Sequence, residues 1–142
     1  MEIKVFPTKA EMAAAAARKA ADALRRALHA RGKAHVIAAT GASQFEFLEA
    51  LVKAPGIDWS RTVFFHLDEY VGVPDTHPAS FRRYLRERIV EKVRPGQFHF
   101  IAGDAADPKA EAARVGALIR AHPIDVAFVG IGEIFEAATA AG

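Results

Sequence analysis

The sequence predicts one α/β domain, built as a Rossmann-like, mostly parallel sheet with helices on both faces. Strand-like and helix-like segments alternate along the whole chain, as in sheets whose parallel strands are joined by crossover helices. The predicted strands are nearly continuous apolar runs, which is typical of strands that are covered on both faces. A length of 142 residues, 51% of them hydrophobic, suffices for one core and is too short for two ordinary domains. Residues 1–142 are therefore expected to form a single domain.

The first predicted elements are a short strand and a long helix. Residues 2–6 (Glu-Ile-Lys-Val-Phe) are strand-like. Thr8 and Glu11 have the spacing of a capping box, and the alanine-rich helix that follows ends at Gly32. Alanine explains much of the hydrophobic content, because it favours helix but contributes little burial.

The next elements are a strand, a helix and a strand. Residues 35–39 form a short apolar strand, which is broken by Thr40 and Gly41. A helix from about residue 43 to 53 follows, with its large apolar side chains on one face. Residues 62–67 form the third strand.

The remaining elements are two helices and two strands. A helix over about residues 78–92 carries apolar side chains at helical spacing. A fourth strand, residues 98–101, precedes a helix over 108–120, in which Asp107 is the N-cap and a proline the first residue. A fifth strand covers residues 124–129.

Composition excludes several classes of function. The absence of cysteine removes disulfides, thiolate metal sites and cysteine nucleophiles, and the six histidines show no metal-ligand spacing. The net charge is only +2, without a basic tract that would suggest nucleic acid. No apolar run approaches the ~20 residues that span a bilayer, and the first residues lack a secretory signal. We expect a cytoplasmic protein with neither a metal, a membrane nor a nucleic-acid partner.

Polar segments follow the predicted strands at the points where the strands end. These segments are residues 40–43, 68–70, 103–104 and 130–132. Parallel α/β sheets bind ligands at the carboxyl ends of their strands, so these segments are predicted to converge on a site.

The segment Thr40, Gly41, Ala42 and Ser43 is a candidate phosphate cradle. Its glycine permits a tight turn, and its amides and two hydroxyls at a helix start suit an anion. An ordinary serine N-cap is an alternative reading. A nucleophile elbow on Ser43 is disfavoured, because the second glycine of Gly-x-Ser-x-Gly is missing.

Asp68 and Glu69 are candidate acid–base groups. A carboxylate at the mouth of an apolar strand is partly desolvated, which raises its pKa and suits it to take a proton. A solvated acidic turn is the alternative. We interpret His66, inside the strand, as a satisfied structural histidine, and His77 as a helix-entry residue rather than a pocket wall.

The glycines of the last polar segment, Gly130 and Gly132, do not make a dinucleotide site. The segment lacks the later glycine of that fingerprint and comes after the last complete strand, so NAD binding is poorly supported.

Three segments together resemble the glucosamine-6-phosphate deaminase/isomerase family. They are Thr-Gly-Ala-Ser at 40–43, Phe-His-Leu-Asp-Glu-Tyr-Val-Gly-Val-Pro at 65–74, and His-Pro-Ala-Ser-Phe at 77–81. Gly130-Ile-Gly132 matches the beginning of a later family motif. The related 6-phosphogluconolactonases usually have arginine where this chain has Tyr70, which favours the deaminase branch.

The resemblance implies a reaction and roles for residues. Family members convert an amino-sugar phosphate to fructose 6-phosphate and ammonia on a modified Rossmann-like fold. Asp68 matches the base that moves a proton between sugar C2 and C1, and Tyr70 would help to place it. The 40–43 segment would contact the substrate, chiefly its phosphate, with Glu69, Gly130 and Gly132 in the same site. No organic cofactor is implied, since the substrate's own carbonyl acidifies the transferred proton.

The chain departs from the family pattern after Gly132. The family continues with Asp-Gly-His, which serves ring opening, whereas Ile134 and Glu136 stand at the aspartate and histidine positions here. Family members are also longer, so we expect a fold that is incomplete at its C-terminal end, with 133–142 as an atypical tail. An exposed edge or apolar surface would then favour association of copies, a possible homo-oligomer.

Three hypotheses of function follow. The first is an amino-sugar phosphate deaminase/isomerase domain with little activity as written. The second is a sugar-phosphate-binding module without ring-opening chemistry. The third, a lactonase-like hydrolase, is disfavoured by Tyr70 and by the lack of a recognisable nucleophile.

Overall fold

The computed structural model describes residues 2–130, which contain five α-helices and four strands. The helices are α1 (Lys9–Arg31), α2 (Phe45–Val52), α3 (Phe81–Leu85), α4 (Glu91–Val93) and α5 (Pro108–Ala121). The strands are β1 (Ala34–Ala38), β2 (Thr62–His66), β3 (Gln97–His99) and β4 (Val126–Phe128). A π-helical turn, Arg86–Val90, joins α3 to α4, and a 3₁₀ turn, Ala42–Gln44, precedes α2.

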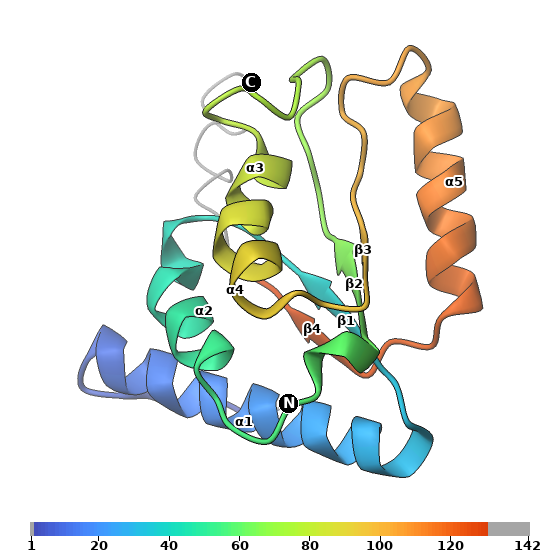
Figure 1. Cartoon of the computed structure of the whole chain (residues 1–142). Helices are drawn as coiled ribbons and strands as arrows, with labels where there is room; N and C mark the ends of the chain where they lie inside the picture. Colours follow the sequence, from blue (N-terminus) through green and yellow to red (C-terminus); the bar gives the residue numbers. More distant parts are fainter. Residues whose placement is uncertain (1, 131–142) are drawn as a thin grey trace.

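The four strands form one parallel sheet in the order β3-β2-β1-β4. Helices α1 to α4 lie on one side of it and α5 on the other (Figure 1). The chain passes from β1 to β2 through α2 on one face of the sheet, and from β3 to β4 through α5 on the other face. The two neighbours of β1, which are β2 and β4, are therefore reached over opposite faces. This is the topological switch point at which open α/β sheets bind ligands. The predicted α/β class, with helices on both faces, is confirmed.

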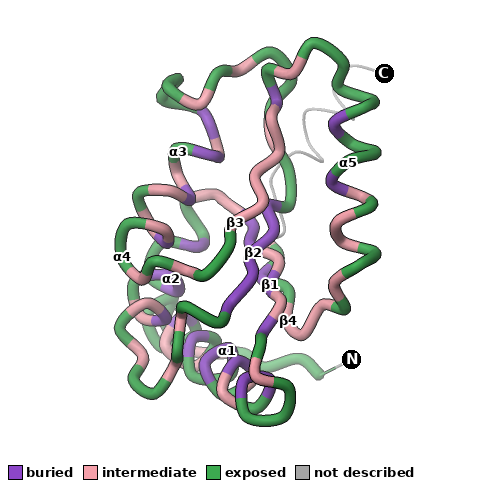
Figure 2. The backbone as a smooth tube through the Cα atoms, turned by 45° about the vertical axis from the view of Figure 1, so that its right-hand side comes forward, coloured by how far each residue is buried: buried purple, intermediate pink, exposed green. Residues whose placement is uncertain are grey.

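The core lies between the sheet and the helices α1 to α4. Its largest fully buried side chains include Leu24, Leu48, Phe64 and Leu85, which come from α1, α2, β2 and α3. Figure 2 shows the buried positions concentrated on β1, β2 and the inner faces of these helices. The apolar face predicted for α2 is confirmed, because Phe47, Leu48 and Leu51 are all buried.

Local capping signals were predicted well. The Thr8 Oγ1 accepts a hydrogen bond from the Glu11 amide at 3.2 Å and donates one to the Glu11 carboxylate at 3.0 Å. Gly32 ends α1 in the left-handed region, with a φ of 74°. Asp107 caps α5 by accepting from two amides of its first turn.

Two predicted elements differ in the structure. The strand predicted over 2–6 is wrong: this segment pairs with no described strand, and Ile3 and Val5 are 75% and 90% exposed. The helix predicted from Pro78 begins at Phe81 instead, because the Ser80 hydroxyl accepts from the Arg83 amide as its N-cap. Four of the five predicted strands are therefore found in the described part of the chain.

Strand β4 is an edge of the sheet as far as the described residues go, and Val129 beside it is 64% exposed. Association of copies through such an edge stays a prediction. Within residues 2–130, no helix has the length and apolar character needed to cross a membrane.

Candidate active site

The loops that follow β1, β2 and β4 emerge side by side at one end of the sheet. Ala38 on β1 pairs with His66 on β2 and with Phe128 on β4. The pairing extends one residue further, since the Leu67 amide donates to the Ala38 carbonyl at 3.2 Å and the Ala39 amide donates to the Phe128 carbonyl at 3.0 Å. The predicted cradle, Asp68 and Gly130 therefore all lie just beyond neighbouring strand ends.

Gly130 approaches the cradle directly. A Cβ atom at Gly130 would lie 3.5 Å from the Ser43 Oγ and 3.3 Å from the Gln44 side-chain nitrogen. The structure thus brings the last predicted glycine segment against the first polar loop, across the switch point. Gly132, Ile134 and Glu136 lie outside the described residues.

The cradle loop, residues 40–44, turns sharply and keeps its middle exposed. Gly41 has a φ of 107° and a ψ of 164°, a conformation that side chains rarely adopt. Thr40 is half-buried, whereas Ala42 and Ser43 are exposed at the start of the turn that leads into α2. Ser43 is thus exposed at the start of the turn that leads into α2, where the sequence predicts an anion site, and anion binding there stays a prediction.

Tyr84 supports the cradle loop from α3. Its hydroxyl donates a 2.9 Å hydrogen bond to the Gly41 carbonyl oxygen, and its ring stacks on Phe45, the first residue of α2. Burial raises the pKa of the Tyr84 hydroxyl to about 12, so it remains a hydrogen-bond donor at neutral pH. No local sequence signal links Tyr84 to the cradle loop, because Tyr84 and Gly41 are 43 positions apart.

A cation also lies beside the cradle loop. The guanidinium carbon of Arg88 is 3.8 Å from the Phe45 ring centroid and 5.0 Å from that of Tyr84. Both distances are within the range of a cation–π interaction. Arg88 therefore adds positive charge next to the first turn of α2, a feature that no sequence motif indicated.

Asp68 reaches solvent at the end of β2, yet its carboxyl lies against enough protein to be partly desolvated. Desolvation raises its pKa above the usual 3.8, and the neighbouring Glu69 charge raises it further. The predicted direction of the shift is confirmed. A carboxylate with a raised pKa is a better proton acceptor, which is what general base catalysis needs.

Glu69 points the other way, into the protein. Its side chain has no exposed area, and both carboxylate oxygens accept hydrogen bonds from the amino end of α3. Burial by itself raises the pKa of Glu69, but the hydrogen bonds from Tyr70, Ser80, Phe81 and Arg82 outweigh it and lower the pKa. The sequence analysis had placed Glu69 with the substrate contacts.

Tyr70 stands at the rim of this loop and remains 51% exposed. Its ring packs against Phe81 with the centroids 4.8 Å apart. The aromatic contact holds Tyr70 beside α3, on the same loop as Asp68.

His66 is buried at the end of β2, with 1% of its area exposed. It lies edge-on to Phe81 and Phe100, and neither ring nitrogen has a hydrogen-bond partner among the described residues. The structural position predicted for His66 inside the strand is confirmed, but the hydrogen bonds expected of a satisfied histidine are not found among the described residues. Burial lowers its pKa to about 4, while Glu69 acts in the opposite direction. His66 is thus neutral at pH 7.

His77 takes part in the turn before α3. Its Nδ1 accepts a hydrogen bond from the Ala79 amide at 3.0 Å. This agrees with the helix-entry interpretation. Searching residues 2–130 finds no cluster of three or more side chains that could hold a metal ion.

A cavity of about 450 Å³ lies beside the cradle loop, between α1 and β4. Ser43 and Gln44 belong to its lining, and the remaining lining is mostly apolar, including Met12, Phe47 and Val129. None of residues 68–70 lines this cavity, so it is distinct from the surroundings of Asp68.

Comparison with known proteins identifies relatives over nearly the whole chain. Residues 7–133 match the family described as glucosamine-6-phosphate isomerases/6-phosphogluconolactonase. The chain is 35% identical to a glucosamine-6-phosphate deaminase of Arthrobacter sp. (strain FB24) over 138 residues, which is 93% of this chain and 52% of that protein. It is 40% identical to that of Exiguobacterium sp. over 83 residues, or 58% of this chain and 33% of the relative.

Solved structures agree with this match. A 6-phosphogluconolactonase from Shewanella baltica OS155 superposes with a TM-score of 0.79 and 26% identity, over 89% of this chain and 55% of that one. A monomeric glucosamine-6-phosphate deaminase superposes with a TM-score of 0.78 over 88% and 52% of the two chains; at 22% identity this likeness concerns the fold. The chain spans about half the length, or less, of the curated relatives named above.

Proposed function

This chain belongs to the family of glucosamine-6-phosphate isomerases and 6-phosphogluconolactonases, and we propose that it carries the phosphate cradle and the proton-transferring carboxylate of a glucosamine-6-phosphate deaminase. One observation carries the proposal: a carboxyl group with a raised pKa, Asp68, and an amide-lined turn, residues 40–43, follow two paired strands at the same sheet end. The deaminase relatives favour this branch of the family.

The cradle would hold the phosphate of the substrate. Exposed backbone amides and the hydroxyls of Thr40 and Ser43 are donors suited to an anion, and the start of α2 adds the favourable end of a helix dipole. Arg88, 3.8 Å from the Phe45 ring, contributes a positive charge from the neighbouring π-helical turn. Gly130, close to the Ser43 hydroxyl, would line the same pocket.

Asp68 would move the proton. Its carboxylate takes the proton from C2 of the open-chain amino sugar, leaving an enolamine whose hydroxyl oxygen is the former C1 carbonyl oxygen and takes its proton from the C2 ammonium group. The same carboxyl returns its proton to C1, which leaves a protonated imine at C2, and water hydrolyses this imine to the C2 ketone and ammonia. The substrate's carbonyl makes the C2 proton acidic, so this step draws on no organic cofactor. Tyr70, on the loop that carries Asp68, would line the sugar site.

A second candidate is a sugar-phosphate-binding module, favoured by a specific feature of the sequence. Ile134 and Glu136 stand where the resemblance places an aspartate and a histidine that open the sugar ring. An isoleucine exchanges no proton, and loss of a general acid–base group costs ~10²–10⁴-fold in rate. We therefore expect the chain to bind the sugar phosphate with little turnover.

Glucosamine 6-phosphate is the substrate to test. Calorimetric titration measures its binding, while ammonia release and exchange of the C2 proton in D₂O measure chemistry. Binding without ammonia release supports the module, and binding with both supports the deaminase. Absence of binding and of exchange would contradict both.

Asp68→Asn assigns the base. Asparagine keeps the shape of the side chain but cannot take a proton, so C2 exchange should fall to background while sugar-phosphate binding stays largely intact. Asp22→Asn, on the exposed face of α1, is the matched control and should retain the exchange rate. Equal exchange rates in the two variants would remove Asp68 from its proposed role.

A cytoplasmic location is part of this proposal. Pairing of copies through β4, as a homo-oligomer, is a separate proposal that sedimentation can test.

A further inference from the structure

We propose that Glu69 is a positioning residue, which holds the Asp68 carboxylate in place by tying the loop after β2 to the amino end of α3. Glu69 would act without touching the substrate. The inference rests on the proposed role of Asp68 as the base, but its evidence comes from contacts that are independent of any ligand.

The first argument is that Glu69 has no free acceptor. Its Oε1 accepts from the amides of Tyr70 at 3.1 Å and Phe81 at 3.0 Å. Its Oε2 accepts from the Ser80 hydroxyl and the Arg82 amide, both at 2.9 Å. A carboxylate has about four acceptor positions, and the protein fills them. With its side chain fully covered, Glu69 offers nothing to a sugar.

The second argument is that these bonds define where α3 begins. Helix α3 has five residues before its π-helical continuation, and so short a helix is not stable by itself. The first amides of a helix have no partners within the helix. Glu69 supplies a charged acceptor to two of them, so α3 and the loop that carries Asp68 are ordered together.

The loop that carries Asp68 is also held by Arg82 and by the segment that follows β3. The Arg82 guanidinium donates to the Val73 carbonyl at 2.8 Å and pairs with Asp104 at 2.8 Å. The Gly72 amide donates to the Gly103 carbonyl at 2.7 Å. Residues 69–74 are thus held between α3 and the segment that follows β3, and Asp68 is the first residue before this fixed stretch.

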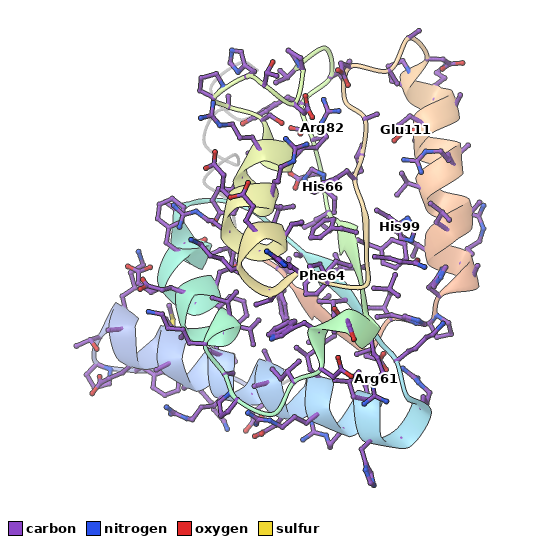
Figure 3. The ribbon with its side chains drawn as sticks, viewed as in Figure 1. Arg61, Phe64, His66, Arg82, His99 and Glu111 are labelled. Atoms are coloured by element: carbon purple, nitrogen blue, oxygen red, sulfur yellow. The ribbon has the colours of Figure 1, made fainter. Side chains whose placement is uncertain are left out.

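Glu69 also acts on Asp68 through its charge. The charged or titratable groups around it are His66 on β2, Arg82 on α3, and Asp104 after β3, which Arg82 neutralises. Figure 3 shows Arg82 and His66 at the same end of the molecule, beside α3. Because like charges disfavour a second ionised carboxylate, Glu69 supports the raised pKa of Asp68.

Glu69→Gln tests the proposal in the full chain. One of its two terminal atoms becomes an amide donor that faces donors, so the loop should be released. Titration of the Asp68 side-chain carboxyl by ¹³C NMR measures the pKa, and hydrogen exchange of the amides of residues 70–73 measures loop opening. We expect a lower Asp68 pKa and at least about tenfold faster exchange.

Asp125→Asn is the matched control. Asp125 likewise has a largely buried carboxylate that ties two segments together, because it accepts from the His35 amide at 2.8 Å and pairs with Arg31, but it lies just before β4, at the opposite end of the sheet. This variant should leave the Asp68 pKa and the exchange of residues 70–73 as in the wild type. A change of the same size in both variants would mean that Glu69→Gln acts only by general destabilisation, and this result would overturn the proposal.

Ser80→Ala is a second variant that tests the same contact if Glu69→Gln does not fold. It removes one of the four donors, so exchange of residues 70–73 should rise by a smaller factor. An unchanged Asp68 pKa with unchanged exchange in either variant contradicts positioning. Weaker binding of glucosamine 6-phosphate with an unchanged Asp68 pKa would instead make Glu69 a substrate contact. Because the pKa and exchange need no substrate, failure of the proposed function is seen separately, as loss of sugar binding in the wild type.

Discussion

The loops after β1 and β2 leave paired strands at the same end of the sheet, but they are held in opposite ways. Residues 40–44 keep Ala42 and Ser43 exposed, and the Tyr84 hydroxyl holds the loop through the Gly41 carbonyl. Residues 68–74 are fixed by the buried carboxylate of Glu69 and the buried guanidinium of Arg82. The first loop is held through the carbonyl of Gly41, whereas the second is held through a buried carboxylate and through the amides of Tyr70 and Gly72.

This difference fits a division of labour between the loops. A phosphate is bound by donors that the protein has not already paired, so the cradle needs exposed amides. A base must be held within a fraction of an ångström of the proton it takes, so its loop needs rigid support. Four expected effects, from large to small, test how differently the two loops are held.

Gly103→Ala should have the largest effect on stability, because the added methyl group forces the clamped loop, residues 68–74, away from the segment that follows β3. A Cβ at Gly103 would collide with the Tyr70 carbonyl oxygen and lie 2.7 Å from the Glu69 Cγ. We expect a loss of at least about 3 kcal/mol in the free energy of unfolding, measured with denaturant.

Gly116→Ala is the control for that variant. A Cβ there meets only the tip of Arg120, at 3.5 Å, within helix α5. Removing a glycine from a helix interior should stabilise the chain by up to about 1 kcal/mol. Equal unfolding free energies for the two alanine variants would mean that the close approach of Gly103 to Tyr70 and Glu69 does not affect stability.

Acid should weaken the fold through His66, which lies beneath the clamped loop. Its pKa is about 4 in the folded chain, against 6.5 for an unperturbed histidine, so between these values the unfolded chain binds the extra proton. Stability therefore falls as the pH drops from about 6.5 to 4, by about 3 kcal/mol for this group alone.

His66→Leu should flatten that part of the pH profile, measured as the free energy of unfolding at each pH. Since neither ring nitrogen has a described partner, leucine should cost little at pH 7. A smaller loss would remain from His99, whose pKa burial also lowers, and at lower pH from Glu69, whose pKa is lowered on folding and whose contribution protonation removes. An unchanged slope between pH 6.5 and 4 in this variant would contradict the assignment.

Tyr84→Phe tests how the cradle loop, residues 40–44, is held. It removes the hydrogen bond to the Gly41 carbonyl and should cost about 1 kcal/mol in the free energy of unfolding. Exchange of the Gln44 amide, which donates to the same Gly41 carbonyl, should become faster, while that of the Tyr70 and Gly72 amides stays unchanged. Tyr70→Phe, at a 51% exposed side chain, should change stability by less. Faster exchange in both loops of Tyr84→Phe would show that they are not held independently.

Arg88→Gln should have the smallest effect. It removes a cation stacked on Phe45 and Tyr84, an interaction worth about 0.5–1 kcal/mol at a partly exposed site. Thermal unfolding would detect the loss, with Arg18→Gln, at an exposed position on α1, as the control. If Arg88 also supplies charge to the cradle, binding of inorganic phosphate should weaken in this variant and not in the control.

Most elements of the fold could be predicted because their signals are local. The capping residues Thr8 and Asp107 act on amides within three positions, and the apolar run at 62–67 reads as a buried strand. The strand predicted over 2–6 failed because strand formation needs a partner, and none is described beside it. Helix α3 starts three residues after its predicted start, because Ser80 is its N-cap and because Glu69, which binds its first turn, is eleven to thirteen positions away.

The sequence by itself determined the α/β class, the positions of the described strands along the chain, and the polar residues that follow each strand, because periodicity, caps and turns depend on near neighbours. Tertiary structure decided what those polar residues do. Asp68 and Glu69 are adjacent and chemically alike, yet one faces solvent with a raised pKa and the other is buried with a lowered one. That choice depends on which donors pack against each carboxylate, and the donors come from α3, a segment that only the folded chain brings to the end of β2.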